Sequence, residues 1–158
     1  TSRMKRKDEI YQELYDADSS YFAGSACFLS LVPILECLEK DMIYFKDAFG
    51  GIYELIDRLI EEDGRYFSLS LEKGKLSDEK WKDILIITQD YAVFLDMLNE
   101  MLSVLPEAGL GRYVPYLKDK FIFLSHLCQS SLSSFYEMED IPEEFFPIAN
   151  ACLSAIRG

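Results

Sequence analysis

The hydrophobic positions of this chain recur every three or four residues along most of its length, which is the spacing of amphipathic helices. The clearest case follows Ser77, where apolar residues keep this spacing from Trp81 to Leu105, about seven turns. Ser77 offers a capping hydroxyl, and Asp78 and Glu79 place acids where the helix dipole favours them. Pro106 then ends the pattern, so we expect one long helix between these signals.

Similar patterns predict five further helices. Their expected ranges are about Met4–Tyr15, a second helix capped within Asp16–Ser19, Asp41–Glu62, Gly111–Met138 and Asp140–Ile156. Asp63–Leu76 is expected to be irregular, with only weak strand alternation at Ser68–Leu71.

Local signals refine three of these helices. Pro33 lacks an N–H group and should kink or restart the second helix near Ser30. The Gly50-Gly51 pair, at about 1 kcal/mol for each glycine, should mark a bend, a break or a close backbone contact. Asp140 and Glu143 have the spacing of a capping box, which predicts that the last helix starts at Asp140.

Two long stretches, Ser19–Leu35 and Phe121–Tyr136, contain no charged residue. Both are expected to be helices hidden inside a bundle with an acidic exterior. The first is at the short limit for a membrane span and contains several serines, so a buried helix explains it better. The predicted fold is all-α: a single-domain bundle of five or six helices over residues 1–158, two or three of them long, with at least one buried uncharged helix. Thr1–Arg3 is interpreted as a cloning remnant.

The net charge of −12 restricts the classes of partner. Nucleic acid and anionic membrane surfaces both require a basic protein surface. A basic protein partner fits better, although acidic surfaces also serve solubility. The four cysteines lie in apolar contexts without CxxC spacing, and no secretory signal is visible. We therefore expect reduced cysteines and a cytoplasmic protein; the even cysteine count leaves a secreted alternative open.

Catalytic and metal-binding signatures do not stand out. His126 is the only histidine and lies in an apolar stretch without a neighbouring acid, so a structural role is expected. A zinc site would need a cluster of Cys and His. Gly109-Leu110-Gly111 follows a helix rather than a strand, which is the wrong context for a phosphate loop. We expect no enzyme, no cofactor and no metal.

Acidic residues are densest near the C-terminus, where five occur within eight positions: Glu137, Glu139, Asp140, Glu143 and Glu144. Phe135-Tyr136 and Phe145-Phe146 flank them. Charge would steer a partner to such a surface and aromatic rings would anchor it. The expected partner-binding residues are these five acids and Phe145.

One short region resembles a known family. Phe28 to Leu38, followed by Asp47-Ala48-Phe49-Gly50-Gly51-Ile52, is similar to the opening helices of the glycolipid transfer protein family, all-α lipid carriers. The resemblance implies that Asp47 stands for the aspartate that holds the sugar headgroup. Gly51 occupies the position where that family has an asparagine, and Trp81 falls too early in its helix to match the stacking tryptophan.

Together these observations predict a non-enzymatic helical domain of regulator, adaptor or inhibitor type that binds a basic protein through an acidic, aromatic-edged surface. The alternative is a carrier or sensor of a hydrophobic small molecule or lipid in a pocket between helices. Aromatic and methionine richness, Gly50-Gly51 and His126 favour that alternative. Self-association is compatible with either function.

Overall fold

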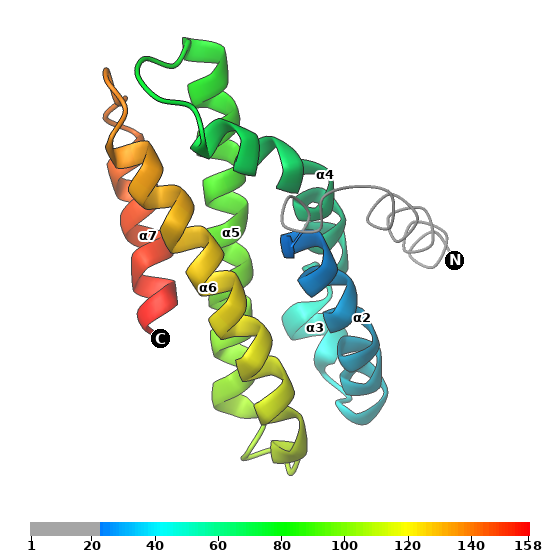
Figure 1. Ribbon diagram of the computed structural model, residues 1–158. Helices are drawn as coiled ribbons and strands as arrows, with labels where there is room; N and C mark the ends of the chain where they lie inside the picture. Colours follow the sequence, from blue (N-terminus) through cyan, green and yellow to red (C-terminus); the bar gives the residue numbers. More distant parts are fainter. Residues whose placement is uncertain (1–22) are drawn as a thin grey trace.

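Helices that pack lengthwise account for most of the structure, a computed structural model that describes residues 23–158 (Figure 1). They are α2 (Ala23–Asp41), α3 (Phe45–Phe49), α4 (Ile52–Ser70), α5 (Asp78–Val104), the 3-10 turn η1 (Gly111–Tyr113), α6 (Val114–Tyr136) and α7 (Phe145–Arg157). The expected all-α bundle is confirmed, and α5 and α6 are its long helices. The helix expected at Met4–Tyr15, its neighbouring cap and Thr1–Arg3 lie outside the described residues.

The central helix α5 packs against α4, α6 and α7 and begins and ends where the sequence predicts. The Ser77 side chain accepts a hydrogen bond from the Lys80 backbone N–H at 3.3 Å, which satisfies one of the open donors at the helix start. After Leu105 and Pro106 the chain turns, and Gly109 adopts a φ of +76°. The capping residues and the buried positions of this helix therefore indicate the same helix bounds.

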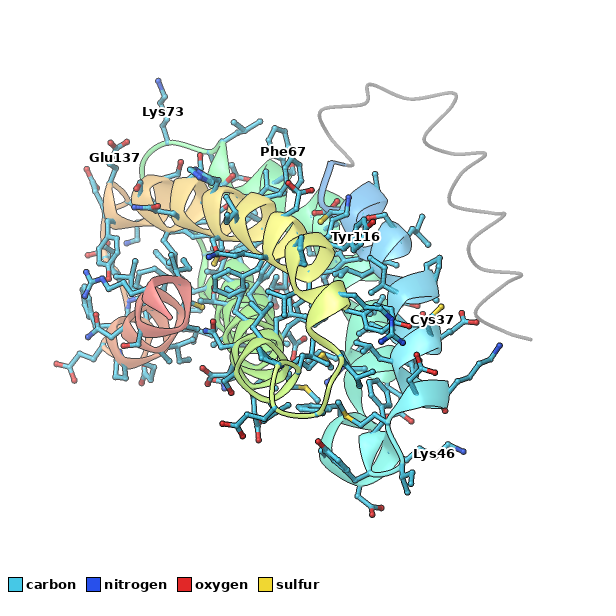
Figure 2. All side chains as sticks on the ribbon, turned by 90° about the horizontal axis from the view of Figure 1, so that it is seen from below. Cys37, Lys46, Phe67, Lys73, Tyr116 and Glu137 are labelled. Atoms are coloured by element: carbon cyan, nitrogen blue, oxygen red, sulfur yellow. The ribbon has the colours of Figure 1, made fainter. Side chains whose placement is uncertain are left out.

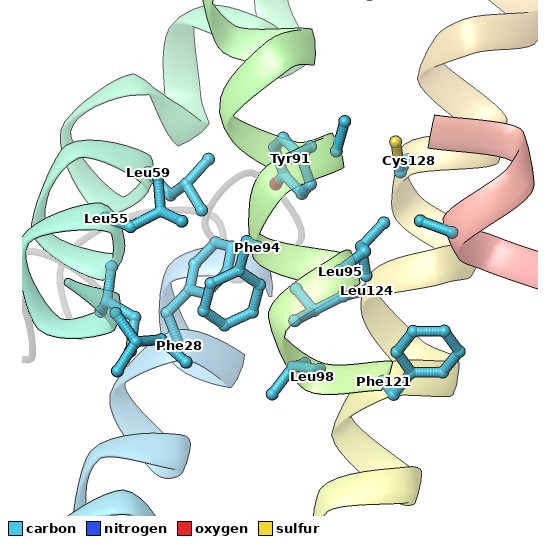
Figure 3. Close-up of a cluster of buried hydrophobic side chains, with 14 of the residues drawn as sticks. Phe28, Leu55, Leu59, Tyr91, Phe94, Leu95, Leu98, Phe121, Leu124 and Cys128 are labelled. Atoms are coloured by element: carbon cyan, nitrogen blue, oxygen red, sulfur yellow. The ribbon is translucent and has the colours of Figure 1, made fainter. Parts of the chain in front are cut away.

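The core lies between α2, α4, α5 and α6 (Figure 3). Phe28 of α2 meets Phe94 of α5 edge to face, with ring centroids 5.2 Å apart, and both are completely buried. Leu55 and Leu59 approach from α4, and Leu124 from α6. Burial of each large side chain stabilises the fold by about 1.5–3 kcal/mol relative to exposure.

The two uncharged stretches have different environments. In the described part of the first, most residues are buried, among them Phe28, Leu31 and Leu35, whereas Ala26 and Pro33 are exposed. The second stretch, in α6, buries one side only. Ile122 and Phe123 are 47% and 42% exposed because α6 lies at the outside of the bundle. The expectation that both stretches are hidden is therefore correct for most of the described part of the first stretch and wrong for the outer side of α6.

Three helix boundaries differ from expectation. The Gly50-Gly51 pair is a break, which divides the predicted helix at Asp41–Glu62 into α3 and α4. Pro33 lies within α2, which continues on both sides of it, so the helix does not restart there. Helix α4 continues through Gly64 to Ser70, whereas the sequence predicted an irregular segment from Asp63. Tyr66 explains the difference, because it is buried in edge-to-face contact with Tyr91 of α5.

None of the helices described combines the length and apolar character that a membrane crossing requires.

Candidate functional site

The predicted acidic residues occupy the loop between α6 and α7, at one end of the bundle (Figure 1). All five are exposed. The loop is fixed by the α4–α5 loop: the Glu139 backbone N–H donates to the Gly74 carbonyl at 3.2 Å, and Lys75 and Glu139 form an isolated bridge. Glu137 and Lys73, one from each loop, lie at the same end of the molecule (Figure 2). Backbone contacts therefore position the carboxylates.

Asp140 sets the direction of the loop. The last helix does not start at this residue, contrary to the prediction. Its φ is +54°, a left-handed conformation that aspartate tolerates better than most residues. Its carboxylate pairs with Lys75 Nζ at 3.1 Å instead of capping a helix. Helix α7 begins at Phe145 without a side-chain cap. The capping-box prediction at Asp140 and Glu143 is thus wrong, because a contact with the α4–α5 loop takes the carboxylate.

The aromatic residues beside the acids divide into a buried pair and an exposed pair. Phe135 and Phe145 are completely buried, and both rings contact that of Trp81. Tyr136 and Phe146 are 39% and 41% exposed, with ring centroids 6.0 Å apart. Phe145 is therefore not at the surface as predicted, because it faces the core at the first turn of α7. The sequentially adjacent Phe146 faces outward instead.

A hollow of about 290 Å³ lies next to the acids. Its lining includes Trp81, Leu85 and Pro142 together with the charged residues Lys82, Asp140 and Glu144. The indole Nε1 of Trp81 is buried and has no hydrogen-bond partner among the described residues. The apolar residues of this hollow can contact the aliphatic part of a basic side chain, and its carboxylates can interact with the charged end.

The charge of the loop is mostly uncompensated. Asp140 is paired with Lys75, and the nearby Lys80 is paired with Glu72 at 3.0 Å. Within residues 23–158 the other four acids of the loop form no ion pair. These are Glu137, Glu139, Glu143 and Glu144. Four free carboxylates on a fixed loop produce a local negative potential that attracts a cation.

A second carboxylate arrangement, absent from the sequence prediction, lies between α4 and α5. The Glu62 and Asp90 carboxyl groups lie close enough to influence each other, and Arg58 Nη2 lies 3.8 Å from Asp90 Oδ1. Burial and, after it, the Asp90 carboxylate raise the pKa of Glu62 to about 7, against a lowering contribution from Arg58. Glu62 Oε2 and Asp90 Oδ2 are buried and have no hydrogen-bond partner within residues 23–158. Asp90 lies beside the apolar stripe of α5, a position that could have identified it.

The remaining candidates do not assemble into a site. His126 is exposed on α6. Among residues 23–158, no three His, Cys, Asp or Glu side chains are grouped so that they could hold a metal ion. Asp47, the headgroup candidate, is exposed on the short helix α3, and Gly51 precedes α4. Trp81 is 3% exposed and packs within the aromatic core.

Comparison of the chain with protein-family models, curated proteins and solved structures yields no significant match.

Proposed function

We propose that this protein binds another protein with a basic surface through its acidic face. The acidic face consists of Glu137, Glu139, Asp140, Glu143 and Glu144 with the exposed rings of Tyr136 and Phe146. One observation carries the proposal: five exposed carboxylates lie on a loop whose backbone is held by Gly74 and Lys75, directly beside an exposed aromatic pair.

Each part of the face has a role in this proposal. The uncompensated carboxylates steer a basic partner toward the loop and raise the association rate. Tyr136 and Phe146 then exclude water and anchor the complex. Because Asp140 and Glu139 are already fixed to the α4–α5 loop, little backbone entropy is lost on binding. A regulator, adaptor or inhibitor without catalytic activity would work in this way.

A cytoplasmic location belongs to the same proposal. All four cysteines are free, and Cys27, Cys128 and Cys152 are buried while Cys37 is exposed. Free thiols are typical of a reducing compartment. Burial raises the pKa of the Cys27 thiol to about 12, which keeps that group unreactive.

The carrier alternative receives less support from the volumes in the structure. The hollow between α4 and α6 measures about 100 Å³, and three other hollows measure about 280–290 Å³. Small-molecule sites usually measure about 300–1,000 Å³. Met101 is completely buried in the core. His126 is exposed at the surface of α6.

Charge reversal tests the proposal. Glu143→Lys combined with Glu144→Lys should reduce the affinity for the partner by at least about tenfold, or about 1.4 kcal/mol. The matched control is Asp96→Lys with Glu100→Lys, which makes the same change in net charge on the exposed side of α5. The readout is the amount of partner retained from a lysate of the source cell by each immobilised variant. Equal retention by both double variants and the wild type would refute the assignment.

A further inference from the structure

The described part of the first uncharged stretch, residues 23–35, lies beside the second stretch in the structure. Helices α2 and α6 pack against each other (Figure 2). The Cys27 thiol of α2 contacts the Lys120 carbonyl of α6 at 3.8 Å. Gly24 and Leu127 line one hollow, so the helices run antiparallel. Their outward sides form what we call the neutral face: Ala26, Ser30 and Pro33 of α2, and Phe123, His126 and Ser130 of α6.

This face is unusual because the rest of the molecule is strongly acidic. The net charge is −12, yet Gly24–Leu35 and Phe121–Tyr136 contribute no formal charge at neutral pH. At the edge of the face, Asp119 and Lys120 pair at 3.9 Å, so their charges sum to zero. Phe123, 42% exposed, borders an open hollow of about 280 Å³ that Ala26 and Ser30 also line.

The charge distribution favours one occupant. A basic partner is attracted to the acidic face, where the negative potential is concentrated. A second copy of this chain carries the same −12 charge and is repelled wherever charged surfaces meet. The residues that define the neutral face carry no formal charge, and the bordering Asp119 and Lys120 offset each other, so contact through this face brings the least like charge together.

The dimensions are also sufficient for a dimer. A stretch of 16 residues, Phe121–Tyr136, is about 24 Å long, and two packed helices are roughly 20 Å wide. The face therefore offers roughly 500 Å² per copy, or about 1,000 Å² in total, which is the lower limit for a specific interface. Small residues at its centre let the two backbones approach closely.

We propose that the neutral face joins two copies of this chain in a two-fold symmetric dimer of modest affinity. Phe123 of each copy enters the hollow bounded by Ala26 and Ser30 of the other. A two-fold axis makes the contact self-complementary and closes the assembly at two copies. The acidic faces remain outside the interface, so this dimer does not depend on the function proposed above.

Sedimentation equilibrium of the full chain from about 1 to 300 µM tests the dimer, because this range brackets modest dissociation constants. The mass should approach that of two copies as the concentration rises. Phe123→Glu should weaken the dimer by about thirtyfold or more, as expected for a central aromatic residue. Val93→Glu, at a position of α5 with nearly the same exposure (41%), is the matched control and should leave the dimer unchanged. Circular dichroism checks that both variants are folded.

Salt provides an independent criterion. Added salt screens the repulsion between the two acidic copies, so the neutral-face dimer should become tighter, whereas a dimer held by ion pairs between oppositely charged patches would weaken. A wild-type chain that stays monomeric over the whole range would overturn the proposal. So would a dimer that survives Phe123→Glu, or one that dissociates as salt is raised.

Discussion

The carboxylate of Asp63 in α4 accepts two hydrogen bonds from Ser25 in α2, one from the backbone N–H and one from the hydroxyl, each at 3.0 Å. Both residues are buried. Burial raises the pKa of the Asp63 carboxyl, and the two bonds from Ser25 lower it in part. This contact joins α2 to α4 directly beside the neutral face, so its loss should loosen the α2 end of the bundle.

Asp63→Ala tests the contribution of this contact to stability. The variant leaves two buried donors of Ser25 without an acceptor, which should cost about 2–4 kcal/mol of unfolding free energy. Chemical denaturation followed by circular dichroism measures it. Glu54→Ala, at an exposed position of the same helix, should change the stability by less than about 0.5 kcal/mol. Equal effects of the two substitutions would contradict the role given to Asp63.

Two glycines provide a second test of the α2–α4 contact. A Cβ atom at Gly24 would collide with Asp63 Oδ1, whereas one at Gly51 would meet nothing within 4 Å. Gly24→Ala should therefore lower the unfolding free energy by about 1–3 kcal/mol, as overpacking does. Gly51→Ala should change it by less than about 1 kcal/mol. Thermal melts of both variants measure the difference, and a destabilisation confined to Gly51→Ala would be inconsistent with this geometry.

The Glu62–Asp90 pair predicts that stability depends on pH. The pKa of Glu62 is raised from its ordinary value of 4.5 to about 7 in the folded protein, first by burial and then by Asp90. The folded state therefore binds this proton more tightly than the unfolded chain. The resulting stabilisation is complete below pH 4.5 and is lost as the pH rises through about 7.

Denaturation midpoints measured between about pH 5 and 8 provide the test of this linkage. The wild-type midpoint should fall with rising pH, and Glu62→Gln should remove much of that slope because its amide does not titrate. Arg58 and Glu61 of α4 and Asp90 of α5 remain in place as the other groups that influence Glu62. A slope that is identical in both proteins would exclude Glu62 as its source.

Substitutions of the adjacent Phe145 and Phe146 test core packing and partner binding separately. Phe145 is completely buried against Trp81, Phe135 and Tyr136, so Phe145→Ala should lower the unfolding free energy by about 3–5 kcal/mol. Phe146 is 41% exposed, so Phe146→Ala should have a much smaller effect on stability but reduce partner affinity by about tenfold or more. Denaturation and partner capture with both variants test this division. Full partner affinity in Phe146→Ala would remove the aromatic anchor from the proposal.

Local signals predicted the helices whose ends depend on nearby residues. Ser77 with Lys80 determines the start of α5, and Pro106 lies just beyond its end. Burial of Asp63 could also have been suspected, because it continues the three- and four-residue spacing of Ile56 and Ile60 along the buried side of α4. A charged residue in such a stripe requires buried partners, and Ser25 provides them.

Contacts between distant segments caused the errors. Nothing near Gly64 in the sequence indicates that Tyr66 will be buried against Tyr91, a contact that keeps α4 helical to Ser70. Likewise, Lys75 takes the Asp140 carboxylate that would otherwise cap a helix. The acidic cluster itself was identifiable from composition, but only the packing shows that Phe146, rather than Phe145, is the exposed ring.

The salt dependence of partner affinity tests the central claim most directly. Partner captured from the source cell would be titrated against the wild type and against the Glu143→Lys, Glu144→Lys double variant, at ionic strengths from about 50 to 500 mM. We predict that the wild-type affinity falls by tenfold or more over this range, while the variant binds weakly throughout with a reduced salt dependence. A wild-type affinity that is unaffected by salt and equal to that of the variant would contradict docking through the acidic face.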